Sequence, residues 1–212
     1  LCLAGLLGVT ITGDAFNIFV FLEISSLSSY VLISLGRQPM ALTAAYRYLV
    51  LGTIGATFYL IGVGLLYQAT GTLNIADLAT RVAELTESRS VRAAFAFMTV
   101  GIGIKLALFP LHIWLPNAYA YAPSVSSAFL AATATKVSIY VLIRVFYTIF
   151  GPAFSFETLP LDWVLLPLAI IAMFAGSTIA IFQVDIKRML AYSSVAQIGY
   201  MIVGVSLVSV LG

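Results

Sequence analysis

Four ionisable side chains lie inside stretches of the 212-residue sequence that are otherwise apolar: Glu23, Lys105, His112 and Lys136. A charge at the centre of a membrane helix costs roughly 2.5–3.5 kcal/mol on insertion scales, and such residues usually face a bundle interior or a wet cavity. Lys136 is too central in its apolar stretch for its ammonium to reach an interface with ease. These positions therefore indicate a functional use of buried charge.

The residue types suit proton transfer. A desolvated lysine gives up its proton more readily, and a neighbouring carboxylate stabilises the ammonium form. If Glu23 approaches or leaves Lys105, the lysine would load and release a proton, and His112 titrates in the range needed to relay between two lysines. Two other interpretations stay open. Glu23 and Lys105 could form a static ion pair that joins helices, and His112 could be a hydrogen-bonded packing residue.

Polar side chains also recur at helical spacing on the same apolar segments. The longest stripe comprises Ser126, Thr133, Lys136, Tyr140 and Arg144. Shorter stripes comprise Glu23, Ser26 and Tyr30, and then Ser193, Gln197 and Tyr200. Residues three, four and seven apart share one face of a helix. The stripes therefore predict a hydrated polar axis through the centre of a helix bundle.

The composition identifies the environment that must position these residues. Hydrophobic residues make up 62% of the chain, charged residues 8%, and the mean hydropathy is +1.10. Soluble domains carry about 25% charged residues, so a soluble globular enzyme is excluded. A net charge of +2 gives no basic patch for a nucleic acid. One cysteine, one histidine and the lack of a glycine-rich phosphate motif predict neither a cofactor nor a metal site in this chain.

Apolar segments of membrane-spanning length follow one another along the chain. A span needs about 20 apolar residues, and long unbroken runs favour helices over barrel strands. We expect a short helix at 1–12 and spans near 15–35, 43–69, 92–110, 124–150, 162–183 and 189–211. The sequence thus predicts an all-α polytopic membrane bundle. Because it begins and ends inside apolar runs, we expect an excerpt of a longer protein.

Two stretches interrupt this pattern. Residues 74–92 are rich in charge, with apolar residues at helical spacing and Asn74 placed to cap a helix; they predict an amphipathic surface helix or, alternatively, a solvated loop. Residues 110–116 are apolar but contain Pro110 and Pro116, and Pro123 follows. Prolines at this density cannot occupy one straight helix. The stretch predicts a broken helix of the kind that marks transport sites, or a kinked helix end with a tight loop.

Four segments together resemble a known family: Gly13–Glu23, Lys105–Pro116, Ala122–Tyr140 and Asp185–Ser194. They are similar to the proton-translocating antiporter-like subunits of respiratory complex I, membrane-bound hydrogenases and Mrp-type cation/proton antiporters. The similarity is closest to the D-type subunit of the Mrp antiporters, and it covers essentially the whole chain. One stretch departs from the family pattern, because Asn117 and Tyr119 replace an acidic residue and a histidine found in many members.

The resemblance implies a fold of about fourteen helices built on two inverted repeats, each with one broken helix. Residues 1–150 would be the first repeat and 151–212 the start of the second. It also implies roles at matching positions. Glu23 would modulate the pumping lysine Lys105, His112 would lie along the transfer path, and Lys136 would connect to the centre of the subunit.

The function expected from residues and resemblance is proton translocation by a channel subunit of a multisubunit monovalent cation/proton antiporter, through a Glu23–Lys105–Lys136 relay. The alternative is a proton-pumping subunit of an NADH-quinone oxidoreductase or membrane-bound hydrogenase. A quinone-reactive subunit, a solute transporter and a membrane scaffold fit less well. Expected partners are other membrane subunits, the lipid bilayer, protons and, if coupled, sodium. We expect a multi-pass protein of a prokaryotic plasma membrane, with Lys187 and Arg188 in the cytoplasm.

Overall fold

The structure is a computed structural model that describes residues 1–207. Its elements follow one another as α1 (Cys2–Ile11), α2 (Ala15–Ser34), α3 (Met40–Thr70), α4 (Ile75–Glu84), α5 (Arg89–Leu106), α6 (Trp114–Tyr121), α7 (Ser124–Ile143), the wider π-helical turns η1 (Arg144–Ile149) and η2 (Ala153–Thr158), α8 (Asp162–Ile181) and α9 (Ile186–Ser206). The predicted all-α bundle is confirmed. Within the described residues the one β-type contact is an isolated bridge between Asp14 and Asn74.

Five helices are long and apolar enough to cross a membrane: α2, α3, α7 continued by η1, α8 and α9. Each coincides with a predicted span. The last span begins three residues earlier than predicted, because the Asp185 carboxylate accepts the N–H groups of Lys187 and Arg188 and so starts the helix ahead of these charges. Residues 208–211 of the predicted span lie outside the described residues.

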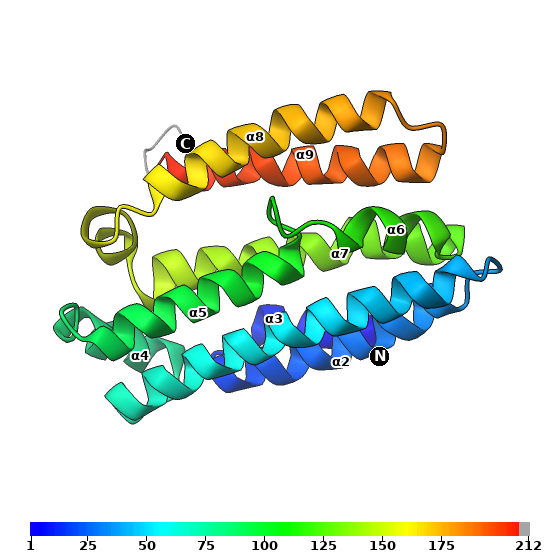
Figure 1. The fold of residues 1–212 in the computed structure, drawn as a ribbon. Helices are drawn as coiled ribbons and strands as arrows, with labels where there is room; N and C mark the ends of the chain where they lie inside the picture. Colours follow the sequence, from blue (N-terminus) through cyan, green and yellow to red (C-terminus); the bar gives the residue numbers. More distant parts are fainter. Residues whose placement is uncertain (208–212) are drawn as a thin grey trace.

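The helices pack in three tiers (Figure 1). α2 lies between α1 and α3, α3 runs along α5, and α8 and α9 form an antiparallel hairpin at the top of the view. The contact between α3 and α5 depends on glycine, because a Cβ atom at Gly101 would lie 2.5 Å from the Gly55 carbonyl oxygen. This close approach brings the C-terminal half of α5, which carries Lys105, against α3, and α3 in turn packs against α2, which carries Glu23.

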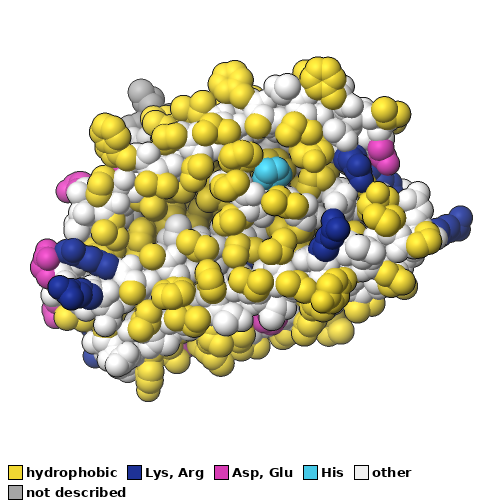
Figure 2. Space-filling model, viewed as in Figure 1, with side chains coloured by type: hydrophobic (Ala, Val, Ile, Leu, Met, Phe, Trp, Pro, Cys, Tyr) yellow, Lys and Arg dark blue, Asp and Glu magenta, His cyan; other side chains and the backbone are white. Residues whose placement is uncertain are grey.

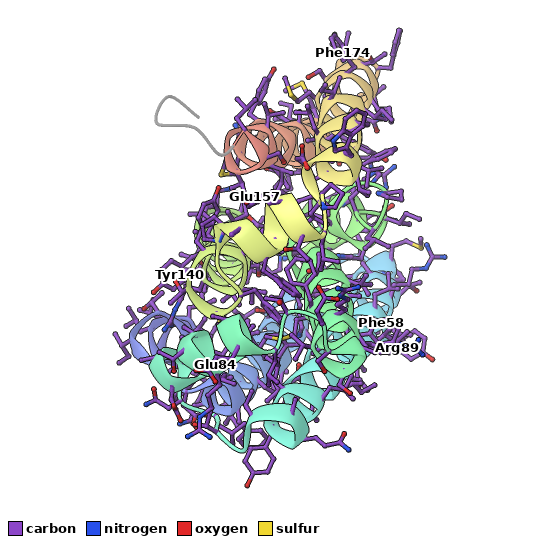
Figure 3. All side chains as sticks on the ribbon, turned by 90° about the vertical axis from the view of Figure 1, so that its left-hand side faces the viewer. Phe58, Glu84, Arg89, Tyr140, Glu157 and Phe174 are labelled. Carbon is purple, nitrogen blue, oxygen red and sulfur yellow. The ribbon has the colours of Figure 1, made fainter. Side chains whose placement is uncertain are left out.

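On the face that Figure 2 shows, most charged side chains lie toward the two ends of the bundle, and hydrophobic side chains cover much of the middle. Figure 3 looks onto one end, where Glu84, Arg89 and Glu157 belong to α4, α5 and η2, while Phe174 projects from the outer face of α8. Phe174 is 71% exposed. An apolar waist between two charged ends is the surface expected of a protein that spans a bilayer.

The charged stretch 74–92 contains the short helix α4 and the start of α5. α4 buries Ile75, Leu78 and Val82 on one face, as an amphipathic helix should. Asn74 caps this helix as predicted, and Asp77 in its first turn accepts a hydrogen bond from Arg81 at 2.9 Å. That hydrogen bond holds the pKa of Asp77 below its usual value. The predicted amphipathic helix is therefore present over residues 75–84.

Asn74 holds the start of α4, since its side-chain oxygen accepts the N–H groups of Ala76 (3.0 Å) and Asp77 (3.3 Å). We expect Asn74→Ala to destabilise this turn by about 1 kcal/mol and to speed hydrogen exchange at both amides. Ser88→Ala is the matched control, because Ser88 precedes α5 without a capping hydrogen bond from its side chain. Equal exchange changes in the two variants would contradict the capping role.

Candidate functional site

A buried ion pair joins α2 to α5. The Lys105 ammonium donates hydrogen bonds to Glu23 Oε1 at 2.9 Å and to Ser26 Oγ at 2.7 Å. Lys105 is 5% exposed, and the Glu23 side chain is 23% exposed. Of the three ion pairs among residues 1–207, the other two lie at exposed positions. The structure thus brings together the predicted carboxylate and the first predicted lysine, inside the apolar waist.

The sequence of α2 explains why its polar atoms point inward. Ser25, Ser26 and Ser29 are all buried, so α2 turns a face of small hydroxyl residues toward the bundle. Glu23 and Ser26 are three residues apart and share that face. Ser25 and Ser29 donate to carbonyls of their own helix, which leaves Ser26 as the hydroxyl that meets Lys105.

Lys105 lies at the point where its helix breaks. α5 ends at Leu106, and Ala107 takes a left-handed backbone conformation with φ of 61°. Residues 107–113 form irregular turns that contain Pro110, and α6 resumes the helical path at Trp114. Pro116 lies in the first turn of α6, where the missing N–H group of proline costs no hydrogen bond. The break leaves Lys105 beside irregular backbone, which is tolerated at membrane depth only where protein buries it or water reaches it.

An aromatic column supports the break from the side of α3. The indole N–H of Trp114 donates to the Ile104 carbonyl at 2.9 Å, next to Lys105 in sequence. The Trp114 ring stacks on Tyr48 with centroids 4.0 Å apart, and Tyr48 meets Tyr30 edge-on at 4.7 Å. All three rings are at most 6% exposed. Sequence reasoning missed Tyr48 and Trp114, although it placed Tyr30 on the face of Glu23.

We expect Trp114→Phe to lower the free energy of unfolding by about 0.5–1.5 kcal/mol, because the Ile104 carbonyl loses one of its two donors and keeps only the Ala107 N–H, while the ring contact with Tyr48 is kept. Thermal unfolding of the intact protein in detergent measures the loss. Trp163→Phe is the control, since Trp163 is 79% exposed on α8 and should change stability by less than about 0.5 kcal/mol. Equal stability of the two variants would exclude the support assigned to Trp114.

His112 lies within the break, half-buried and apart from the ion pair. Its ring stacks on Phe109 with centroids 5.1 Å apart and faces Tyr192 of α9 edge-on at 6.5 Å. Its Nδ1 atom is buried and finds no hydrogen-bond partner among residues 1–207. His112 therefore contacts the α8–α9 hairpin and makes no hydrogen bond to Lys105 or Lys136 in the described part of the chain.

Lys136 is half-buried on α7, and its ammonium donates to the Ala131 carbonyl of the same helix at 2.7 Å. The far end of the predicted stripe does not join a central axis. Tyr140 donates to the Thr10 carbonyl and Arg144 to the Thr12 carbonyl, so both hold the C-terminal end of α1 and the turn after it. These residues fasten helices together, because the carbonyls at the end of α1 need donors.

Within residues 1–207, no group of three or more histidine, cysteine, aspartate or glutamate side chains is arranged to hold a metal ion. What the site offers is a buried ammonium held by one carboxylate and one hydroxyl, at the end of an interrupted helix. Such a pair can change its protonation state when the carboxylate moves, because the charged lysine depends on its counter-charge.

The sequence matches relatives of two kinds. The profile of the family described as "NADH:quinone oxidoreductase/Mrp antiporter, TM" matches residues 12–212. The N-type subunit of the NADH-quinone oxidoreductase of Desulforudis audaxviator is 51% identical over 211 residues, covering 98% of this chain and 41% of the relative. The D-type subunit of the Na(+)/H(+) antiporter of Alkalihalophilus pseudofirmus is 39% identical over 207 residues, covering 97% and 41%. The chain thus spans about two-fifths of the length of these relatives.

Chains of three solved membrane complexes also resemble this chain in structure. A chain of the Mrp complex from Dietzia sp. matches with a TM-score of 0.87 and 33% identity, over 99% of this chain and 38% of that one. A chain of the membrane-bound sulfane sulfur reductase, an archaeal respiratory membrane complex, matches with a TM-score of 0.86 and 34% identity, over 97% of this chain and 41% of that one. A chain of respiratory complex I from Thermus thermophilus matches with a TM-score of 0.75 and 31% identity, over 93% of this chain and 42% of that one.

Proposed function

The chain belongs to the NADH:quinone oxidoreductase/Mrp antiporter transmembrane family, and on that premise we propose that it carries protons as a channel subunit of a multisubunit monovalent cation/proton antiporter. The observation that carries the proposal is the ion pair of Glu23 and Lys105, buried at a helix break. A charge pair of this kind is costly inside a membrane protein, and residues retained at such a cost usually serve transport.

The proposed mechanism begins with a change at this pair. With Glu23 against it, Lys105 holds its proton; when the carboxylate withdraws, the buried ammonium loses its counter-charge and gives the proton up. Onward transfer would pass His112 and reach Lys136. Neither residue is hydrogen-bonded to the pair, so the proposed route requires water bridges or side-chain movement between these steps. Such movement should cost least free energy in the irregular backbone at 107–113, which lies outside the helices.

The second candidate is a proton-pumping subunit of a redox-driven complex. It is favoured by the 51% identity to a relative named as the N-type subunit of an NADH-quinone oxidoreductase, whereas the first is favoured by the relatives named as D-type antiporter subunits. Both functions would use the same residues in this chain. They differ in the partner subunits, which would supply either a cation pathway or the redox chemistry.

Either function places the chain in a larger assembly. The matching solved chains come from multisubunit membrane complexes, and we propose other membrane subunits as partners, with protons and, if coupled, sodium as the transported ions. We also propose a prokaryotic plasma membrane as the location. Residues 1–150 would form the first inverted repeat and residues 151–212 the start of the second.

Reconstitution of the intact protein with its native partner subunits tests the proposal. In sealed vesicles without a redox substrate, we expect an imposed sodium gradient to drive proton movement, read with a pH-sensitive dye. If protons move only when an electron donor and a quinone are added, the redox-driven alternative is correct. If neither condition moves protons in a fully assembled complex, the transport function is wrong and a scaffold role takes its place.

A further inference from the structure

Two cavities adjoin near the end of the bundle that carries the α2–α3, α6–α7 and α8–α9 turns (Figure 1). The first has a volume of about 430 Å³ and is lined by residues of the α2–α3 turn, the α6–α7 turn and Lys187. Its ionisable side chains, apart from Tyr121, are Arg37 and Lys187, and no carboxylate of the described residues lines it. A cavity with two cationic groups and no acidic one favours an anion.

The second cavity has a volume of about 340 Å³ and lies between α7 and α9. Small and apolar side chains form much of its wall, among them Ala128, Ala131 and Leu190. It shares Ser124 and Lys187 with the first cavity. The two spaces are therefore neighbours of opposite chemistry, one cationic and one apolar, that meet at the same lysine.

The cations of the first cavity are not neutralised by the protein around them. The carboxylate on the same turn, Asp185, accepts the backbone N–H groups at the start of α9 and makes no ion pair among residues 1–207. Lys187 donates to the Ala122 carbonyl at 2.8 Å, which holds its ammonium at the junction of the cavities. Arg37 makes no hydrogen bond within the described part of the chain and is exposed.

The neighbourhood of both cavities is apolar and open. Leu35 is 64% exposed, Ile186 is 70% exposed and Leu190 is 56% exposed. Exposed aliphatic side chains next to cationic ones are typical of the level where lipid headgroups meet acyl chains. A ligand that reached this place from the bilayer would meet the charges with its head and the apolar cavity with its tail.

We propose that this double cavity binds a phospholipid with an anionic headgroup, whose phosphate contacts Arg37 and Lys187 and whose acyl chain enters the space between α7 and α9. Charge complementarity selects the head, because a cationic cavity attracts a lipid with net negative charge more strongly than a zwitterionic one. The continuity of the two cavities selects the amphiphile, because a free anion would leave the apolar space unused.

Native mass spectrometry tests the preference for an anionic headgroup. The intact protein is titrated with phosphatidylglycerol or with phosphatidylcholine of the same chain length. We expect tighter binding of phosphatidylglycerol, and a loss of about fivefold in Arg37→Gln, the effect of one basic residue near an anionic surface. Arg47→Gln is the matched control, because Arg47 is an exposed arginine near the start of α3 that lines neither cavity; we expect less than about a twofold change. Equal losses in both variants, or no preference for phosphatidylglycerol, would overturn the proposal.

A second variant tests the tail. Ala128 is exposed and lines the apolar cavity, so Ala128→Phe should fill the space without disturbing a buried contact. We expect it to weaken phosphatidylglycerol binding while the preference of the remaining binding for an anionic head persists. Unchanged binding in Ala128→Phe, or displacement of the lipid by inorganic phosphate alone, would assign the cationic cavity to a free anion and overturn the lipid site.

Discussion

Lys105→Ala should abolish proton translocation while the protein still assembles, because it removes the group proposed to load the proton. Lys105→Arg should be equally inactive, although an arginine can keep an ion pair with Glu23. A guanidinium does not deprotonate in a protein, so a site that works by releasing a proton fails with arginine. We expect a loss of about 10²-fold in both variants, in the range of a positioned acid–base group. Proton flux in vesicles, normalised to assembled protein, is the measurement.

This pair of variants separates transport from a static contact. If the Glu23–Lys105 bridge serves only to hold α2 against α5, Lys105→Arg should retain flux and stability, whereas Lys105→Ala should lose stability. Arg47→Ala is a suitable control, because it removes an exposed cationic side chain that takes no part in the proposed path and lines neither cavity. Normal flux in an assembled Lys105→Arg protein would exclude the titrating role.

The helices could be predicted from the sequence because a bilayer allows few solutions. Apolar runs of about 20 residues must satisfy their backbone internally, and the predicted spans coincide with α2, α3, α7 continued by η1, α8 and α9 to within a few residues. The span predicted near 92–110 falls on α5, which is not among the five helices of the described residues that are long and apolar enough to cross a membrane. The span predicted over α5 extends to residue 110, beyond the end of that helix at Leu106. The helix ends where it does because Ala107 takes a left-handed conformation. The local sequence does not predict this conformation, since alanine favours helix.

The contact between Glu23 and Lys105 is predicted from the free-energy cost of isolated charges in a membrane helix. In the structure the two side chains form a direct hydrogen bond. The partners of the polar stripe on α7 cannot be predicted in the same way. Helical periodicity shows that Lys136, Tyr140 and Arg144 share a face, but not which neighbour that face meets. Because α1 packs there, Tyr140 and Arg144 contact its terminal carbonyls. Periodicity fixes direction within one helix, whereas partners are set by packing between helices.

The same limit explains why the aromatic column was missed. Tyr48 and Trp114 lie far apart in the sequence and look like ordinary apolar residues in their segments. Their parallel stack at 4.0 Å arises only when the break between α5 and α6 carries Trp114 back against α3. The Trp114 indole then donates a second hydrogen bond to the Ile104 carbonyl in the last turn of α5, which also accepts the Ala107 N–H at 3.2 Å. A proline-rich break in the sequence predicts a helix end whose carbonyls need donors, but not the side chain that supplies one.

Glu23→Gln should lower proton flux about tenfold, because the amide can still accept a hydrogen bond from Lys105 but no longer compensates its charge; a tenfold change corresponds to about 1.4 kcal/mol of lost charge compensation. Ser26→Ala is the matched control: it removes the other partner of the ammonium and keeps the carboxylate and its charge, so flux should fall by less than in Glu23→Gln. The measurement is proton flux in vesicles at several pH values, with thermal unfolding run in parallel. A carboxylate that drives loading must affect flux more than a neutral hydroxyl at a similar distance. If both variants lower stability equally and leave flux intact, Glu23 and Ser26 merely hold the lysine in place, and the proton must be loaded elsewhere in the protein.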